Sequence, residues 1–269
     1  MIRWTTLLLL TLLLLPANAR AQATGQAQPP EPAGSRLQAI LQAGTLRVGL
    51  TGDYRPFSIV DAGAPDGMTG IDVDMAASLA QSLGVKLQVV RTSWSNLMPD
   101  LLAGRFDLAL GGITVTLARA RTAFFSAPVM TAGKAAIARC ADVAKYQTLA
   151  AIDRTEVRVI VNPGGTNESF DRASLHQAQI VVFPDNAKIF DALAAGQADV
   201  MITDGVETKL QAKLHQGALC PIHPDQPFNS SELAYMMPQD PAWQQYVDLW
   251  LRVSDESGEH RRIVSKYLD

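Results

Sequence analysis

The sequence is poor in the residues that mark several large classes of protein. It has no run of basic residues, and aromatic residues make up only 6% of it, so nothing favours nucleic acid binding. The histidines show no metal-ligand spacing; they are His176, His215, His223 and His260. No G-x-S-x-G motif indicates a hydrolase triad, and NPGGTNES lacks the G-K-[ST] ending of a phosphate loop. We therefore expect neither a metal nor an organic cofactor.

Long apolar runs are scarce as well, and the one at the N-terminus has the features of an export signal. Arg3 precedes the apolar residues 7–15, and small residues surround the positions after Ala19 and Ala21. We predict a signal peptide over residues 1–21, cleaved after one of these alanines. A retained membrane anchor is the alternative, although the run is short for a span. Residues 22–35, rich in Pro, Gly, Gln and Ala, are predicted to be a disordered linker. The mature protein is expected to be periplasmic and free of the membrane.

Cysteine is rare too, since the chain contains only Cys140 and Cys220. Both lie in the part predicted to be exported, where oxidising surroundings favour a disulfide between them. Two buried free thiols are the alternative that the sequence leaves open.

What the sequence does contain is an alternation of strand and helix patterns. Ser35 is predicted to cap a helix that ends at Gly44. Two β-α-β-α-β series follow, and helices close the chain. The first series has strands at 45–50, 86–92 and 106–112 and helices at 71–84 and 95–105; the second has strands at 157–162, 179–183 and 198–204 and helices at 168–175 and 186–197. This order predicts an α/β fold with mostly parallel sheets.

The two series also share a short motif. Residues 101–112 (LLAGRFDLALGG) and 192–204 (ALAAGQADVMITD) both have the pattern helix, Gly-x-x-Asp, strand. We interpret the halves as two lobes. A ligand site is then expected in the cleft between them, at the carboxyl ends of the strands.

Polar and aromatic residues follow these strand ends. A threonine-rich turn with an arginine can hold a carboxylate, an aromatic ring can form a wall, and an acid can take an amine. Surface arginines, core aromatics and helix caps are the corresponding structural alternatives. The candidates are Thr114, Thr116, Arg119 and Arg121 after residues 106–112, Tyr54 and Phe57 after the first strand, Trp94 and Asn96 at a strand-to-helix junction, the stretch 161–170, and Thr203-Asp204.

The segment GITVTLARARTAFFSAPV (112–129) resembles the part of periplasmic amino-acid-binding proteins whose arginine holds the α-carboxylate of the ligand. The resemblance implies that Arg119 and Thr114 contact a carboxylate and that Asp204 binds an amine. It also implies a backbone cradle from the other lobe, formed by GGTNE with Gly165, Thr166 and Asn167.

This resemblance covers residues 36–269 and implies the bilobed type II periplasmic binding protein fold, with two doubly wound mixed sheets. The chain of such a fold crosses its hinge twice, and we expect the crossings near residues 131–136 and 232–237. Lobe 1 would then contain residues 36–132 and 236–269, and lobe 2 residues 133–235.

Other stretches resemble the cyclohexadienyl dehydratases, which are exported enzymes of the same fold; they are TGDYRPFS, GIDVDMA, TSWSNLM, IVNPGGTNESF, PDNAKIF and HPDQPF. These enzymes convert prephenate into phenylpyruvate or arogenate into phenylalanine. The glutamate of their NPGGTNE run is the general acid, which implies that role for Glu168. The resemblance therefore implies a carbon–oxygen lyase that acts on a small molecule. The alternative is an amino-acid-binding protein that serves a transporter.

The position of Glu168 needs an explanation, because a carboxylate beside an anion cradle would repel the anion. The helix N-terminus favours the charged form by about 0.3–1 kcal/mol, whereas burial can raise a carboxyl pKa by about 3–5 units. We therefore expect Glu168 to take up a proton with substrate or on closure of the cleft, beside the substrate carboxylates, and to be able to give that proton. A first-turn glutamate that only complements the helix dipole is the alternative.

The other candidates have simpler expected tasks. Tyr54 and Trp94 would wall the substrate ring, Asn96 would bind a substrate oxygen, and Asp204 would receive the amine of arogenate. Lys134, at the expected hinge, either meets a second carboxylate or is a surface lysine. The preference between the two substrates and the oligomeric state stay open.

Overall fold

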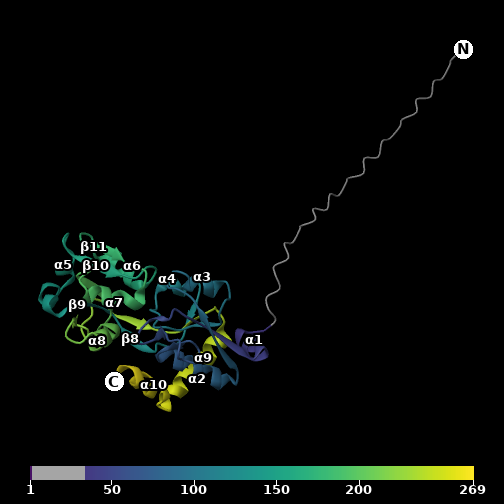
Figure 1. Cartoon of the computed structure of the whole chain (residues 1–269). Coiled ribbons are helices and arrows are strands. Elements are labelled where there is room, and N and C mark those ends of the chain that lie inside the picture. The colour runs from purple at the N-terminus through teal and green to yellow at the C-terminus, as the bar shows by residue number, and fades with distance from the viewer. Residues whose placement is uncertain (2–33) are drawn as a thin grey trace. The chain divides into compact units, whose positions relative to one another are not determined.

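The computed structural model describes Met1 and residues 34–269 (Figure 1). The predicted signal peptide beyond Met1 and the predicted linker up to residue 33 lie outside the described residues. Among the helices of the described part, none is long and apolar enough to cross a membrane.

Two five-stranded sheets form the framework, in the orders β5-β1-β6-β15-β7 and β11-β10-β12-β9-β13. In the first sheet β1 is parallel to β5 and β6, while β15 is antiparallel to β6 and β7. In the second, β10 is parallel to β11 and β12, while β9 is antiparallel to β12 and β13. The prediction of an α/β fold with two mixed sheets is confirmed. The strands are β1 (Thr45–Leu50), β5 (Lys86–Arg91), β6 (Leu108–Ala109), β7 (Phe124–Phe125) and β15 (Met236–Met237) in the first sheet, and β9 (Lys134–Arg139), β10 (Arg158–Val161), β11 (Gln179–Val182), β12 (Val200–Asp204) and β13 (Leu219–Ile222) in the second.

Two short strands accompany the passages of the chain between the sheets. Strand β8 (Met130–Ala132) comes directly before β9, and β14 (Ser231–Leu233) comes directly before β15. The two strands pair antiparallel with each other. We propose these passages as the hinge, with lobe 1 at residues 36–132 and 236–269 and lobe 2 at 133–235. A separate three-stranded sheet consists of β2 (Asp53–Tyr54), β3 (Ser58–Val60) and β4 (Met68–Thr69).

Helices begin and end where the local sequence provides caps. The side chain of Ser35 accepts a hydrogen bond from the backbone N–H of Gln38, and Gly44 ends α1 with a φ of 62°. Gly84 ends α2 in the same left-handed way, so both predicted helix ends are confirmed. The helices are α1 (Arg36–Ala43), α2 (Ile71–Leu83), α3 (Leu97–Leu102), α4 (Leu117–Ala120), α5 (Leu149–Ile152), α6 (Thr166–Ser174), α7 (Ile189–Ala194), α8 (Gly205–Leu214), α9 (Pro241–Glu256) and α10 (Glu259–Leu268), with 3-10 turns η1 (Cys140–Lys145) and η2 (Asn186–Lys188).

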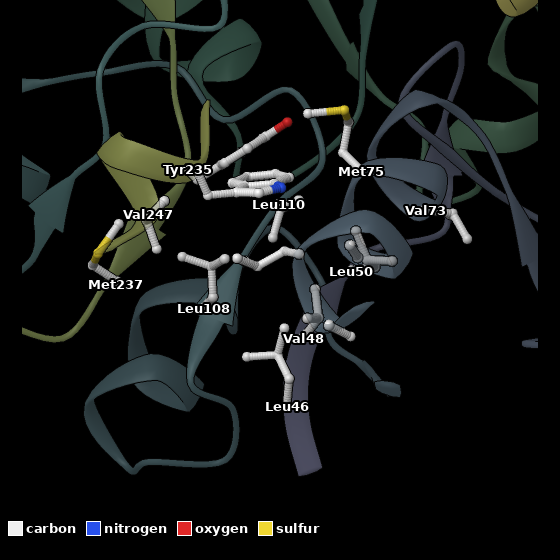
Figure 2. Packing of buried hydrophobic residues seen from close by; sticks show 14 of the residues in the cluster. Leu46, Val48, Leu50, Val73, Met75, Leu108, Leu110, Tyr235, Met237 and Val247 are labelled. Atoms are coloured by element: carbon white, nitrogen blue, oxygen red, sulfur yellow. The ribbon is translucent and has the colours of Figure 1, made fainter. Parts of the chain in front are cut away.

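The core of the first sheet packs the strands against α2 and α9. Figure 2 shows leucines and valines of β1 beside Leu108, Leu110 and Tyr235. All of them are buried, and each fully buried leucine contributes about 1.5–3 kcal/mol. Helices α2, α9 and α10 contact one another (Figure 1). This core holds the carboxyl end of β1 in a fixed position.

The repeated Gly-x-x-Asp motif has the same physical role in both halves. Asp107 accepts hydrogen bonds from the backbone N–H, Nε and Nη2 of Arg47, at the start of β1. Asp199 accepts the same three from Arg158, at the start of β10. In each half the arginine also donates to the carbonyl of the motif glycine. The motif therefore ties the end of a helix to the central strand of each sheet.

The strand predicted over residues 106–112 is shorter in the structure. Only Leu108–Ala109 are in β6, because Gly111 and Gly112 have φ values of 122° and 66° and turn the chain away. The predicted disulfide between Cys140 and Cys220 is present. The alternative of two free thiols is therefore wrong.

Candidate functional site

A small cavity lies where the carboxyl ends of strands from both sheets meet. Its volume is about 20 Å³, room for about one water molecule. Seven of the predicted site residues line it, from both proposed lobes. The lining consists of Tyr54, Trp94, Gly112, Thr114, Asn162, Gly165, Thr166, Asn167, Asn186 and Asp204.

Aromatic rings form one wall of the cavity. The ring of Tyr54 lies 5.1 Å from that of Phe57 and 5.6 Å from that of Trp94, the latter edge to face. Trp94 Nε1 donates to the carboxylate of Asp53, which fixes the indole. A Cβ added to Gly112 would lie 2.5 Å from the Phe57 ring, so only glycine lets the rings pack against this turn. The arrangement can hold a flat or puckered six-membered ring.

Hydroxyl and guanidinium groups form another side. The hydroxyl oxygens of Thr114 and Thr166 lie 3.1 Å apart across the two proposed lobes. Arg119 Nη1 donates to the carbonyl of Thr114, although Arg119 is not itself in the cavity lining. Within residues 34–269, no carboxylate pairs with this guanidinium. An arginine of this kind can bind a ligand carboxylate.

A buried ion pair forms the floor of the site. Lys134 Nζ donates to Asp204 Oδ1 at 2.7 Å, and both side chains are 3% exposed. The ammonium also donates to Asn167 Oδ1 at 2.6 Å and to Thr166 Oγ1 at 3.2 Å. The hydroxyl of Tyr54 donates to Asp204 Oδ2 at 2.5 Å. The interpretation of Lys134 as a surface lysine is therefore wrong.

A second carboxyl group lies behind this pair. Asn167 Nδ2 donates to Thr203 Oγ1, which donates to Glu207 Oε2 at 2.6 Å. Burial raises the pKa of Glu207 well above its usual value, and the negative Asp204 adds to the shift. Burial thus favours the neutral form of Glu207.

Glu168 has contacts that favour its charged form. It lies in the first turn of α6, where its Oε2 accepts from the N–H of Gly164 at 2.7 Å and its Oε1 accepts from Nε and Nη2 of Arg172. These contacts, with the Gly164 hydrogen bond foremost, lower the pKa of Glu168. Two donors stabilise the carboxylate here and the side chain keeps 20% exposure, so the uptake of a proton by Glu168 with substrate or on closure stays a prediction. The contact with Gly164 resembles a capping box.

Asn96 is not where its expected role requires. It is exposed at the N-cap of α3 and is absent from the cavity lining. The structure brings Trp94 to the cavity but not Asn96, because the chain turns into the helix between them.

Two asparagines without a role predicted from the sequence line the cavity: Asn162, included only within the candidate stretch 161–170, and Asn186, which was not named. Asn162 and Asn186 are 3% and 6% exposed, and the Oδ1 of each has no hydrogen-bond partner among the described residues. Asn186 Nδ2 donates to the carbonyl of Asp53 in the other proposed lobe, at 3.0 Å. Unpaired buried acceptors of this kind suit a ligand donor such as a hydroxyl. Their place at or near a strand end was the available signal. Asn162 ends the strand predicted over 157–162, as Asp204 ends the one over 198–204, and Asn186 lies three residues beyond the strand predicted over 179–183.

The two proposed lobes touch closely around the cavity. Gly164 has a φ of 82°, and a Cβ there would lie 2.2 Å from the side chain of Ser95. Ligand pockets usually have volumes of about 300–1,000 Å³, far above the 20 Å³ of this cavity. A ligand the size of a substituted six-membered ring therefore requires the lobes to move apart before it enters.

Comparison with known proteins identifies relatives over almost the whole described chain. Residues 46–269 match the family described as bacterial extracellular solute-binding proteins, family 3. The chain is 50% identical over 236 residues to the cyclohexadienyl dehydratase of Pseudomonas aeruginosa, a match that covers 87% of each protein.

Solved structures that resemble this chain belong to proteins of the same kind. An ancestral amino acid-binding protein, described as a precursor of cyclohexadienyl dehydratase, superposes with a TM-score of 0.81 at 33% identity and covers 87% of this chain and 100% of its own. A variant of an ancestral cyclohexadienyl dehydratase superposes with a TM-score of 0.54 at 49% identity and covers 88% of this chain and 98% of its own.

Proposed function

Because the chain belongs to family 3 of the bacterial extracellular solute-binding proteins, we propose that its cleft binds a small carboxylated molecule in the periplasm. We further propose that it is an enzyme of the cyclohexadienyl dehydratase type, which converts prephenate into phenylpyruvate and arogenate into phenylalanine. The observation that carries the proposal is the 50% identity to the Pseudomonas aeruginosa enzyme over 87% of both proteins. The cavity supports it, because a carboxylate-binding side faces an aromatic wall.

The reaction needs little besides position and one proton. The C4–O bond of prephenate breaks and the hydroxyl leaves as water, while the bond to the ring carboxylate breaks and releases carbon dioxide. The electron pair of that carbon–carbon bond completes the aromatic ring. The prephenate dianion and one proton thus give the phenylpyruvate anion, carbon dioxide and water. A positioned acid contributes about 10²–10⁴-fold to such a step.

The binding residues have defined parts in this scheme. Arg119 with Thr114 and Thr166 holds the carboxylate of the side chain, while Tyr54 and Trp94 wall the ring. Asn186 Oδ1, whose orientation is fixed by the bond from Nδ2 to Asp53, accepts the hydrogen of the C4 hydroxyl. This leaves the lone pairs of that oxygen available to the acid, and the fixed geometry itself lowers the barrier.

We propose Glu168 as the acid, with a condition that the structure adds. Arg172 now stabilises its carboxylate, so Glu168 gains a proton only after this arginine releases it. The ring carboxylate of the substrate can compete for Arg172 and, as a nearby negative charge, raise the pKa of Glu168. Arg172 is suited to the exchange, because its side chain is 56% exposed.

The test is turnover of prephenate at neutral pH by the wild type and by Glu168→Gln, followed as phenylpyruvate. We expect kcat to fall by about 10²–10⁴-fold while KM changes little, because glutamine keeps the shape but is not an acid. Arg172→Gln should keep activity to higher pH than the wild type, because the pKa of Glu168 is no longer lowered by the guanidinium.

Glu256→Gln is the matched control, since Glu256 is exposed on α9 and its replacement should leave kcat unchanged. A Glu168→Gln variant with wild-type kcat would rule out Glu168 as the acid. A wild type that binds free amino acids tightly and turns over neither substrate would support a transport receptor instead.

A further inference from the structure

Asp204 is the one carboxylate in the cavity lining of the described chain, and the protein already supplies its counter-ion. Lys134 Nζ lies 2.7 Å from one carboxylate oxygen, and the Tyr54 hydroxyl donates to the other. Both members of the ion pair are 3% exposed. A ligand ammonium would have to share this carboxylate with a second cation a few ångströms away.

The lysine is fixed in this position by acceptors of the protein. Its ammonium has three N–H donors, and three acceptors surround it: Asp204 Oδ1, Asn167 Oδ1 and Thr166 Oγ1. Thr166 Oγ1 also lies 3.1 Å from Thr114 Oγ1, in the proposed carboxylate-binding side. Lys134 is therefore next to the place of the carbon that adjoins the substrate carboxylate.

The two proposed substrates differ at that carbon alone. Prephenate carries a keto oxygen there, which accepts hydrogen bonds, whereas arogenate carries an ammonium, which only donates. Lysine has donors and no acceptor, so Lys134 can pair with the keto oxygen in place of its longest contact, the 3.2 Å hydrogen bond to Thr166 Oγ1, and it repels the ammonium. We infer that Lys134 is a specificity-determining residue that makes the cleft prefer prephenate, and keto acids generally, over arogenate and other amino acids. This inference rests on the proposed dehydratase function.

The charge balance of the site agrees with this assignment. Lys134 and Asp204 offset each other's charge in the floor, while Arg119 has no carboxylate partner among residues 34–269. The unpaired positive charge of Arg119 favours the ligand with the greater negative charge. Prephenate has two carboxylates and no amine, whereas arogenate has two carboxylates and one ammonium.

The experiment compares kcat/KM for prephenate and arogenate in the wild type, in Lys134→Met and in the double variant Lys134→Met with Asp204→Asn. We expect the wild type to prefer prephenate by roughly 10- to 100-fold, the usual effect of an unpaired or repelled buried group. Lys134→Met frees Asp204 for a ligand ammonium, so the preference should reverse and favour arogenate by roughly 10- to 100-fold. The double variant has neither charge and should have a ratio near one. It also covers the case in which the single variant, with an unpaired buried carboxylate, fails to fold.

Calorimetric binding of phenylpyruvate and phenylalanine by the same proteins separates this inference from the proposed function. These two ligands also differ only in keto oxygen against ammonium, so the wild type should bind phenylpyruvate more tightly and Lys134→Met should reverse the order even if no turnover occurs. Lys209→Met is the control, because Lys209 pairs with Asp225 away from the cavity. Equal use of arogenate by the wild type, or ratios unchanged in the single and double variants, would overturn the inference. Absence of any turnover, with the expected order of binding, would overturn only the dehydratase proposal.

Discussion

At the scale of single residues, the most unusual group outside the cavity is Asp171. It lies on α6, is fully buried, and neither carboxyl oxygen has a hydrogen-bond partner among the described residues. Burial, opposed by the charge of Lys134, raises its pKa from 3.8 to about 8. Asp171 is therefore largely protonated in the folded protein at neutral pH, because an isolated buried carboxylate costs more than a neutral acid.

This shift predicts a pH dependence of stability. The folded protein keeps the Asp171 proton up to about pH 8, whereas the unfolded chain loses it above about pH 4. The unfolded state thus binds fewer protons in this window, so the free energy of unfolding falls as pH rises from 4 to 8. At about 1.4 kcal/mol per unit, the loss from this residue is at most about 6 kcal/mol. Asp171→Asn should remove it, so urea unfolding should show the variant to be a few kcal/mol more stable than the wild type at pH 8 but not at pH 4.

Asp66→Asn serves as the control, because Asp66 is exposed and its replacement removes the same charge without touching the core. Burial also raises the pKa of Asp72, to about 6. The free energy of unfolding will therefore still fall with rising pH in every variant, but less steeply. If Asp171→Asn loses as much stability between pH 4 and pH 8 as the wild type, Asp171 is ionised in the folded protein.

The roles of single residues were predictable only where the neighbouring sequence restricts them. Tyr54, Trp94, Thr114 and Asp204 follow strands and do line the cavity. The sequence analysis left open whether Lys134 lies in the site or on the surface, although the small apolar residues of TAGKAAIA around it were a signal of burial. The Arg172 contact of Glu168 has the i to i+4 spacing of a helix pair and was readable from the sequence. Whether this contact or burial decides the pKa of Glu168 could not be predicted from the sequence, because the answer depends on how exposed the side chain is in the folded protein.

At the scale of elements, the Gly-x-x-Asp motif is the feature that the two proposed lobes share. Its aspartate binds the backbone and side chain of the arginine that begins the central strand, Arg47 in one half and Arg158 in the other. Hydrogen bonds to charged groups contribute about 1.5–3 kcal/mol each, reduced here because the arginines are about one-third exposed. The motif therefore stabilises each sheet at the end opposite the cavity.

Removal of the motif aspartates should destabilise the fold without altering the cleft. We expect Asp107→Ala to lower the free energy of unfolding by about 2–4 kcal/mol. Asp199→Ala should lower it less, by about 1–3 kcal/mol, because Asp199 is more exposed, 15% against 4%. Urea unfolding measures both values, with Asp185→Ala as the control, since Asp185 forms an exposed pair with Lys188 that is worth well under 1 kcal/mol. Losses no larger than in the control would show that the motif contributes only to the chain turn.

Most of the long elements were predictable from the sequence and the short ones were not. The parallel strands β1, β5, β10, β11 and β12 have clear apolar patterns, α1 has caps at both ends, and α2 ends at Gly84. The six-residue strand β9 was not predicted. Strands of two or three residues, such as β8 and β15, are too short to show a period. Helix α8 was missed because it follows Asp204 without any break in the sequence, and a strand-end acid was interpreted only as a ligand group.

At the scale of the whole molecule, the bilobed fold and a cleft at the strand ends were predictable from the order of elements and from the resemblance. The size of the cavity was not. Its volume depends on contacts between the proposed lobes, such as Tyr54 with Asp204 and Asn186 with Asp53. Contacts that join positions more than a hundred residues apart leave no periodic pattern in the sequence. The disulfide, in contrast, followed from the presence of only two cysteines.

The disulfide is expected to stabilise the molecule without adjusting the cleft. It links residues 80 positions apart, and closing a loop of that length stabilises by about 4–5 kcal/mol in the chain-entropy model. Cys140 directly follows β9 and Cys220 lies on β13, where Ala138 already pairs with Cys220, and neither cysteine lines the cavity. Replacement of both cysteines by serine should therefore lower the free energy of unfolding, measured in urea, by about this amount. The value of kcat/KM for prephenate at 25 °C should stay within about twofold of the wild type, because the variant is still mostly folded at that temperature.

Reduction of the wild type with a dithiol is the control. It should give the same loss of stability in the wild type and no further loss in the serine variant. If kcat/KM falls more than about tenfold in a variant that is still folded, the disulfide must also govern how the two lobes meet, because Cys140 follows the end of β9 opposite Lys134.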